Sequence, residues 1–267
     1  MTTPETTGRA VQFEVFGGPE VLRVRDVPVP QAGPGQLRVR VAAAGLNPMD
    51  WFMTTDAETA ARFGLSLPCG FGTDYSGVVD QVGEGVSAYA VGDRVFGGVL
   101  SRAVADYVVV DEAGTIAVGG EAHRTPSGVD DRTAATLAIA GRTAAAAVAV
   151  VKPGPGDTVL VGGDRVRELA PAGVTAVMDL HGTDTAQTAR ELGVPDERIT
   201  TIAAQVDGIT PANGANAPYA ALDEIAGLVA AGKLRVPIAA GYPVDQIRTA
   251  VELQAGRHVQ GKIVIDL

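Results

Sequence analysis

The sequence predicts an α/β plus β fold, in which a β-rich first part is followed by an α/β part. Residues 11–110 form short apolar stretches separated by Gly and Pro, which is typical of β structure. Residues 130–151 are rich in Ala and lack Pro, and residues 158–161 form a short apolar run, typical of a strand buried in a parallel sheet. The 267 residues leave room for two modest domains at roughly 100 to 200 residues each.

The strands of the first part are recognised by alternating apolar and charged residues. This alternation occurs in residues 21–29 and 37–41, and a Gly-Pro turn separates the two stretches. Further strands are expected at residues 75–82, 94–96 and 105–110. Many short strands joined by glycine-rich turns favour an antiparallel barrel or sandwich over a helical domain.

The second part is expected to alternate helices and strands. Residues 130–151 favour two helical segments that meet near Gly141. The elements expected after them are a turn at 152–157, a strand at 158–161, a helix at 164–170, a strand at 174–180, an exposed loop at 208–218, an amphipathic helix at 222–233 that ends at Gly232, a short helix at 244–254 and a final strand at 262–267.

Composition excludes several classes of partner. The formal net charge is −10, and the chain has only three lysines, so no basic face for nucleic acid is expected. No apolar run approaches the roughly 18 residues of a membrane-spanning helix. The first eight residues lack the basic start and apolar stretch of a secretory signal, and Cys69 has no second cysteine with which to pair. We therefore expect a cytoplasmic protein.

Six stretches occur in an order that resembles the medium-chain dehydrogenase/reductase superfamily, in its zinc-free quinone oxidoreductase branch. They are residues 21–35, 44–50 (AGLNPMD), 72–79 (GTDYSGVV), 82–86, 91–97 (VGDRVFG) and 261–264. The resemblance implies a GroES-like β-barrel catalytic domain at residues 1–125 and 235–267, with a Rossmann-type domain at 126–234. It also implies a homodimer that uses NADPH to reduce a quinone, an enone or a related conjugated carbonyl.

The resemblance also shows where the zinc ligands of other members have been replaced. Those members carry a Cys soon after the strand that here ends at Gly45, where this chain has residues 46–48. They carry a His-Glu pair where this chain has Thr73 and Asp74. Because a catalytic zinc needs about three Cys, His or carboxylate ligands, we predict that the chain binds no metal.

The catalytic residues suggested by the resemblance follow that first strand. Asn47 occupies the place of an amide near the nicotinamide ring, where it can donate to a developing oxyanion or to the carboxamide. Asp50 and Trp51 follow on the same loop, and Trp51 can form a flat wall against a planar ring. The alternatives are that Asn47 belongs to a simple turn and that Trp51 anchors the core. Thr73 and Asp74 are expected to fix the neighbouring loop.

Further cofactor contacts are implied at Thr143 and Lys262. Thr143 matches a threonine at a helix start that faces the nicotinamide, and its hydroxyl can also cap that helix. Lys262 resembles a basic residue that faces the cleft between the domains, and the alternative is a solvated strand residue. We expect His123, His181 and His258 to lie on the surface or in loops, and Cys69 to be a small packed side chain.

The nucleotide-binding fingerprint is incomplete in this chain. A glycine-rich turn and a helix that receives the pyrophosphate should follow residues 158–161. Gly162 and Gly163 begin this turn as cofactor-binding candidates, but residues 164–171 resemble a segment that comes later in the family. The simplest account is that the loop, its helix and the ribose pocket are missing between Gly163 and Asp164. The sequence therefore predicts weak NADPH binding, or none.

Three accounts of the shortened segment stay open. They are a natural or engineered deletion, a segment left out and closed up by renumbering, and a variant that has lost its cofactor for another role. The alternative to a reductase is accordingly a cofactor-free pseudoenzyme or ligand-binding protein on the same scaffold. A third hypothesis is an oligomer held together by sheet edges that the loss of inner strands would expose.

Overall fold

The computed structural model describes residues 6–162, 173–180, 182–202, 204–256 and 258–267. It divides into two compact units, Met1–Ile139 with Leu222–Leu267 and Ala140–Ala221. The first unit extends beyond residue 125, and its second part begins before residue 235, because α3 (Asp131–Ala134) and α7 (Ala221–Ala230) belong to its core. Ala134, Leu222 and Ala226 pack there against Phe96 of the sheet.

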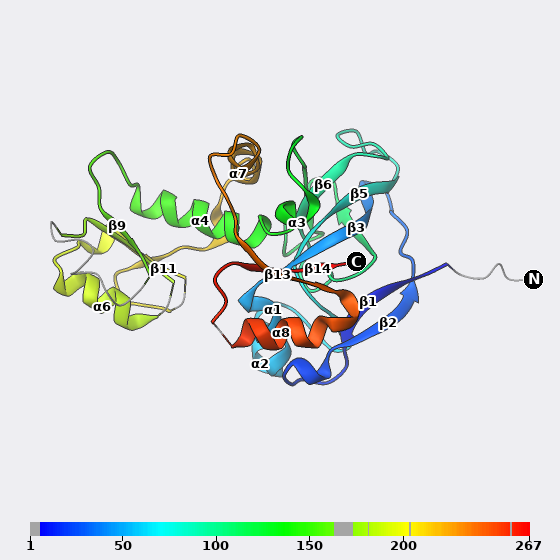
Figure 1. Cartoon of the computed structure of the whole chain (residues 1–267), viewed down its shortest axis with the longest axis horizontal. Coiled ribbons are helices and arrows are strands. Elements are labelled where there is room, and N and C mark those ends of the chain that lie inside the picture. The colour runs from blue at the N-terminus through cyan, green and yellow to red at the C-terminus, as the bar shows by residue number, and fades with distance from the viewer. Residues whose placement is uncertain (1–5, 163–172, 181, 203, 257) are drawn as a thin grey trace, which may run out of the picture. The chain divides into compact units, whose positions relative to one another are not determined.

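The first unit is built around a large sheet with the long strand β3 (Gln36–Leu46) at its centre (Figure 1). β3 pairs antiparallel with β5 (Asp74–Val82), β7 (Tyr107–Asp111) and β14 (Lys262–Asp266). The sheet also contains β6 (Arg94–Gly98), β8 (Glu121–Arg124) and β13 (Ile238–Pro243). In the described part of the chain the strand order is β13-β14-β3-β5-β6-β8, and β7 also pairs with β3. The end of the chain therefore returns to the domain in which the chain begins.

Besides α3 and α7, this unit contains further helices and a smaller sheet. Its strand order is β2-β1-β4, with β1 at Thr7–Phe13, β2 at Arg23–Pro28 and β4 at Cys69–Gly70. The helices are α1 (Pro48–Thr55), α2 (Ala57–Arg62) and α8 (Ile247–Ala255), and single 3-10 turns lie at Pro19–Val21 and Val244–Gln246. Phe13, Leu46 and Val251 share one apolar core, and Cys69 packs against it as a half-buried side chain.

Helices α1 and α2 correct the expectation of a loop after Asn47. Asp50 and Trp51 lie within α1 and not on a loop. The sequence contains the signals for this helix, since Asn47 is an N-cap residue, Pro48 is the first helical residue and Asp50 stands three positions after the cap. Strands β8 and β13 were not predicted either; β8 has only four residues, whereas β13 has six but includes Gly241 and Pro243.

The break between the two helices after Asp130 also differs from the expected position. The helices α3 and α4 (Ala138–Val151) are separated by residues 135–137, and Gly141 lies inside α4. The backbone N–H of Ile139, in the first turn of α4, donates to Oδ1 of Asp74 at 3.0 Å. A side chain 65 residues away in the sequence therefore helps to fix where α4 begins.

The second unit contains an all-parallel sheet, as predicted for the α/β part. Its strand order among the described residues is β12-β11-β10-β9, with β9 at Val159–Val161, β10 at Ala176–Asp179, β11 at Ile199–Thr201 and β12 at Thr210–Pro211. Helix α6 (Thr183–Glu191) packs Ala186 and Ala189 against Val177 and Ile199 of this sheet, and 3-10 turns lie at Asp196–Arg198 and Gly214–Asn216. The helix expected at 164–170 and the junction of Gly163 with Asp164 lie outside the described residues.

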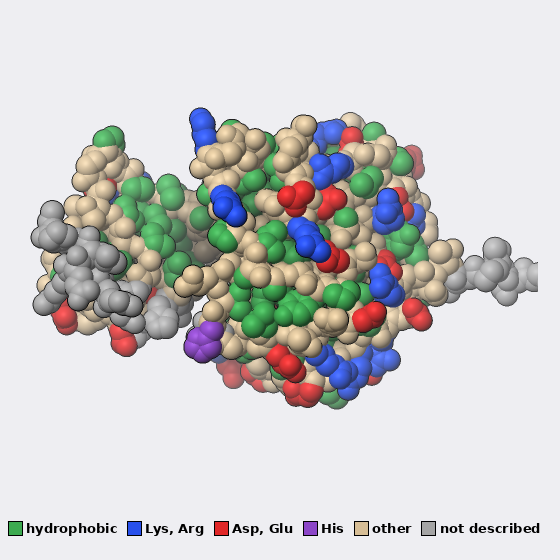
Figure 2. All heavy atoms as spheres, viewed as in Figure 1, with side chains coloured by type: hydrophobic (Ala, Val, Ile, Leu, Met, Phe, Trp, Pro, Cys, Tyr) green, Lys and Arg blue, Asp and Glu red, His purple; other side chains and the backbone are tan. Residues whose placement is uncertain are grey.

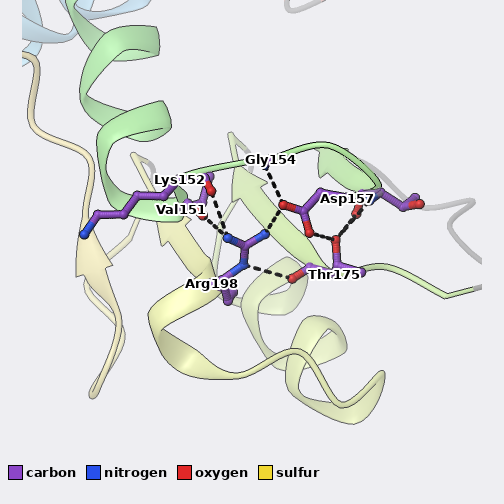
Figure 3. A network of polar contacts seen from close by, with 7 residues as sticks. Val151, Lys152, Gly154, Asp157, Thr175 and Arg198 are labelled. Atoms are coloured by element: carbon purple, nitrogen blue, oxygen red, sulfur yellow. Dashed lines mark hydrogen bonds and ion pairs between the residues drawn. The ribbon is translucent and has the colours of Figure 1, made fainter.

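A network around Arg198 joins separate segments of the second unit (Figure 3). The guanidinium donates to the carbonyl oxygens of Val151 and Lys152 at the end of α4, at 2.5 and 3.0 Å. It also pairs with Oδ2 of Asp157 at 2.6 Å, and Oδ1 of Asp157 accepts from the Thr175 hydroxyl at 2.8 Å. These contacts satisfy carbonyl groups that the end of a helix leaves without intrahelical partners.

Replacing Arg198 with alanine is expected to destabilise the second unit by about 2 kcal/mol, because hydrogen bonds to charged groups are lost. Hydrogen bonds from the Gly154 N–H, the Thr175 hydroxyl and the Arg198 guanidinium lower the pKa of Asp157 to about 2. Ionised Asp157 therefore stabilises the fold above about pH 4, and this contribution disappears as the pH falls through about 2. In thermal melts, Asp157→Asn should lower Tm at pH 7 and leave it nearly unchanged near pH 2. An equal loss at both pH values would contradict this role.

The surface of the first unit carries charges of both signs. Figure 2 shows acidic and basic side chains interspersed on its visible face. No helix within the described ranges is long and apolar enough to cross a membrane.

Candidate active site

The end of one strand and the starts of its two neighbours lie side by side at one end of the large sheet of the first unit. β3 ends at Leu46, while β5 and β14, its antiparallel neighbours, begin at Asp74 and Lys262. Gly45 is paired with Asp74, and Leu46 with Ile263. The register therefore brings Asn47, Asp74 and Lys262 together from distant parts of the sequence.

Asn47 and Asp50 are locked together at the start of α1. The backbone N–H of Asn47 donates to Oδ2 of Asp50 at 2.7 Å, and the Thr73 hydroxyl donates to Oδ1 of Asp50 at 2.7 Å. All three residues are buried. Burial raises the pKa of Asp50 to about 7, the nearby Asp74 also raises it, and the two hydrogen bonds and Lys262 act in the opposite direction.

Lys262 lies between the Asn47 amide and the Asp74 carboxyl group. Its Nζ donates to Oδ1 of Asn47 at 2.5 Å and lies 3.8 Å from Oδ2 of Asp74. The Asp74 side chain is fully buried, whereas that of Lys262 is 16% exposed. Burial raises the pKa of Asp74 to about 6, although Lys262, the Asn47 amide and the Ile139 N–H each lower it.

Two polar atoms of this cluster are left over for another molecule. Nδ2 of Asn47 and Oδ2 of Asp74 are buried, and within the described part of the chain neither makes a hydrogen bond of normal geometry, although the Asn47 amide lies close enough to Asp74 to lower its pKa. A buried donor without a partner costs free energy, and such groups are uncommon in folded proteins. With the Lys262 ammonium beside it, the free N–H group of Asn47 provides a second donor for an oxygen that develops negative charge.

The structure brings together only some of the predicted site residues. Asn47, Asp50 and Lys262 form the cluster, and the partly buried Trp51 packs against the core and stacks on Phe52 with ring centroids 4.4 Å apart. Thr143 and Gly162 belong to the second unit. Thr143 is inside α4 and not at its start, Gly162 follows β9 with φ +67°, and Gly163 lies outside the described residues.

His123 corrects the expectation of a histidine on the surface or in a loop. It lies on β8 with a fully buried side chain, and Nδ1 is 2.9 Å from Oδ1 of Asp223. His258 is exposed outside the helices and strands, and His181 lies outside the described residues. Sequence reasoning also missed Glu121, two residues before His123, and assigned Asp74 a structural role. In a sequence, buried strand residues are recognised by alternating apolar and polar positions, and the four residues of β8 are too few to show such an alternation.

The Asp50 carboxyl group should make stability depend on pH. Its pKa of about 7 in the folded chain exceeds the ordinary value near 3.9, so the folded state holds the proton more tightly. Stability should then fall as the pH rises from about 4 to about 7. In urea titrations at pH 5 and pH 8, Asp50→Asn should lose less stability between the two pH values than the unmodified protein. The exposed Asp26→Asn variant should behave like the unmodified protein; the same behaviour in Asp50→Asn would contradict the assignment.

The described residues do not gather ligands for a metal ion. Among them, no three His, Cys, Asp or Glu side chains lie close enough together to hold one. The zinc-free assignment stays a prediction.

Two family models match the chain. Residues 33–120 match the alcohol dehydrogenase GroES-like domain, and residues 105–265 match the zinc-binding dehydrogenase family. The second match covers well over half of the chain.

Similar proteins and structures agree with these matches. The human quinone oxidoreductase is 35% identical over 168 residues, which are 61% of this chain and 47% of that protein. A Pseudomonas aeruginosa quinone oxidoreductase is 34% identical over 135 residues, 51% of this chain and 38% of that one. This chain thus spans about half the length, or less, of the curated relatives it matches.

The fold is shared with solved structures. The Coxiella burnetii quinone oxidoreductase superimposes with a TM-score of 0.75 at 23% identity, covering 98% of this chain and all of that one. The prediction of a GroES-like domain joined to a Rossmann-type domain is thereby confirmed. The chain belongs to the zinc-binding dehydrogenase family, in the quinone oxidoreductase-like branch of the medium-chain dehydrogenase/reductase superfamily.

Proposed function

We propose that the protein is a zinc-independent oxidoreductase that transfers hydride from NADPH to a quinone, an enone or a related conjugated carbonyl. The observation that carries this proposal is the buried Nδ2 of Asn47, which has no partner among the described residues and stands beside the Lys262 ammonium. The quinone oxidoreductase relatives support the reaction class.

The cluster suits a reaction in which negative charge develops on oxygen. Reduction of a conjugated carbonyl produces an enolate, and reduction of a quinone produces a quinol oxyanion. Lys262 and Asn47 can stabilise either one, because both donors are held in place before the reaction. Asp74 and Asn47 orient the ammonium, and the buried Asp50 and Thr73 hold the start of α1 in place.

NADPH supplies the hydride when it is bound. In the first unit, the free Nδ2 of Asn47 fits an oxygen acceptor such as a carboxamide. In the second unit, Gly162 follows the first parallel strand, and a side-chain carbon added there would meet no atom of the described residues within 4 Å. Asn47 and Lys262 of the first unit would hold the nicotinamide, and Thr143, Gly162 and Gly163 stay the cofactor-binding candidates that the family resemblance implies.

One observation favours the alternative of a cofactor-free binding protein on the same scaffold. β9 pairs directly with β10, and only residues 162–175 connect the two strands. The glycine-rich turn and the helix that receives the pyrophosphate would both have to fit into this short connection. Among the described residues, β9 is the outermost strand at one side of its sheet. The hypothesis of an oligomer held together by exposed sheet edges requires such an outermost strand.

Titration with NADPH, followed by a turnover assay with a small quinone, separates these proposals. Saturable binding and quinone-dependent oxidation of NADPH support the reductase. Binding of a quinone without binding of NADPH would replace it with the binding protein. Sedimentation tests the expected homodimer and would reveal larger assemblies held by sheet edges. Fractionation of cells tests the expected cytoplasmic location.

A further inference from the structure

The Thr73 hydroxyl belongs to a loop that backbone hydrogen bonds hold in the first unit. The carbonyl oxygen of Thr73 accepts from the N–H of Val99 at 2.8 Å. The carbonyl oxygen of Gly72 accepts from the N–H groups of Arg102 and Ala103, at 2.9 and 3.1 Å. Thr73 is also fully buried, so its side chain has no solvent to which it could turn. The loop therefore presents the hydroxyl in one fixed place.

The Thr73 hydroxyl and the Asn47 backbone occupy the two oxygens of Asp50. Oδ1 of Asp50 accepts from the hydroxyl and Oδ2 from the Asn47 N–H, both at 2.7 Å. Distances this short are typical of hydrogen bonds to an ionised carboxylate. The resemblance suggests a catalytic role for Asp50, but the residue is 1% exposed and both of its oxygens are engaged within the first unit. Asp50 is thus placed to hold Asn47 and not to touch a substrate.

The charge of Asp50 depends on Thr73. Burial raises the pKa of Asp50, and the Thr73 hydroxyl is the largest of the contributions that lower it. The Asn47 N–H and Lys262 also lower this pKa, whereas Asp74 raises it. Hydrogen bonds to an ionised acceptor are roughly twice as strong as those to a neutral one. Loss of the Thr73 hydroxyl would therefore favour the neutral form of Asp50 and weaken its hydrogen bond to the Asn47 N–H.

The opposite end of α1 is held by a separate contact. The Thr54 hydroxyl donates to the carbonyl oxygen of Gly17 at 2.9 Å, and the N–H of Gly17 donates to the carbonyl oxygen of Thr54 at 2.7 Å. Thr54 is buried like Thr73. The attachment of α1 therefore does not rest on Thr73 alone, and the contact of Thr73 with Asp50 acts on the first turn, where Asn47 lies.

We propose that Thr73, through Asp50, positions the Asn47 amide for the reaction, and that Asn47 is held most firmly while Asp50 is ionised. This role rests on the proposed function, in which Nδ2 of Asn47 donates to the developing oxyanion. Oδ1 of Asn47 accepts from Lys262, while Asp50 fixes the backbone of Asn47. With the side chain and the backbone both held, Nδ2 keeps one direction before the reaction begins. Thr73 and Asp50 are positioning residues, because each acts through Asn47.

The first test does not require turnover. Hydrogen exchange of the Asn47 backbone N–H, followed by NMR at pH 8, reports how firmly Asp50 holds it. Thr73→Val should speed this exchange about 10-fold, and Thr73→Ser, which keeps the hydroxyl, should restore the slow rate. The matched control is Thr54→Val, which removes a buried hydroxyl at the other end of α1 and should leave the exchange unchanged. An unchanged rate in Thr73→Val, or the same acceleration in both valine variants, would overturn the proposal.

The unmodified protein provides a measurement that needs no variant to fold. The protection of the Asn47 N–H against exchange, corrected for the intrinsic effect of pH, should rise between pH 5 and pH 8, because Asp50 ionises around pH 7. Constant or falling protection over this range would overturn the proposal.

The second test asks whether turnover depends on this contact. In an assay with NADPH and a quinone, Thr73→Val should lower kcat about 10-fold with little change in KM, and Thr73→Ser should restore kcat. Thr54→Val should leave kcat unchanged. In the unmodified protein kcat should rise around pH 7. This rise should move to higher pH in Thr73→Val and disappear in Asp50→Asn, since Asp74 and Lys262, the other titratable groups of the cluster, are present in every variant.

The outcomes separate positioning from a structural role. A purely structural contact would lower Tm in both valine variants without moving the pH profile of kcat. Faster exchange in Thr73→Val with unchanged kcat would overturn the role in turnover. Absence of NADPH oxidation by the unmodified protein overturns the proposed function, and hydrogen exchange still decides whether Thr73 holds Asn47 in place.

Discussion

Replacing Lys262 with methionine is expected to lower kcat/KM for quinone reduction by about 100-fold or more. Loss of one preorganised donor to an oxyanion typically has an effect of this size. Methionine keeps much of the length of the side chain but removes the contacts to Asn47 and Asp74. Steady-state kinetics with NADPH and a quinone measure the change.

A second readout of Lys262→Met does not depend on turnover. Because the ammonium lowers the pKa of Asp74, its removal should raise that pKa above about 6, as carboxyl NMR titration would show. The matched control is Lys233→Met, since Lys233 is exposed beyond the end of α7. Equal kinetics in the two variants would exclude Lys262 from the reaction. An unchanged Asp74 titration would exclude electrostatic coupling between Lys262 and Asp74.

Replacing Gly45 with alanine is expected to destabilise the first unit by about 3 kcal/mol. An ideal Cβ at Gly45 would lie 2.2 Å from the carbonyl oxygen of Ala135, far inside van der Waals contact. β3 cannot shift to relieve this clash easily, because Gly45 is paired with Asp74 on one side and Val264 on the other. The midpoint of urea unfolding measures the effect.

Gly227→Ala provides the matched control for this substitution. Gly227 is exposed inside α7, and a Cβ there would meet no atom within 4 Å. Alanine should therefore stabilise this helix by about 1 kcal/mol through its higher helix propensity. If the midpoint of urea unfolding shifts in the same direction in both variants, β3 and residue 135 are not held as closely together as the structure indicates.

Local patterns predicted much of the fold. The alternation in residues 37–41 lies within β3, and the apolar run at 158–161 contains β9. The helix expected at 222–233 overlaps α7 in all but its first residue, and Gly232 follows α7 with φ +68°. These elements are set by side-chain periodicity and by glycine at a helix end, and both are properties of neighbouring residues.

The candidate site was predictable only in part. Asn47, Asp50 and Lys262 were proposed from the resemblance to the family, and the structure places all three in one cluster, in which Asn47 and Asp50 are buried and Lys262 is partly exposed. The role of Asp74 and the burial of His123 were not predicted, because both depend on partners distant in the sequence. Asp74 contacts Ile139 and Lys262, and His123 contacts Asp223, 100 residues later.

The sequence by itself determined the order of the β-rich and α/β parts, the family, and the residue types available for chemistry. Only the tertiary structure decided which of these residues meet, because strand register, unlike periodicity, depends on pairing between distant segments. Register brings the end of β3 to the starts of β5 and β14. Burial in that arrangement raises the pKa of Asp50 to about 7 and that of Asp74 to about 6, because desolvation disfavours the charged carboxylate.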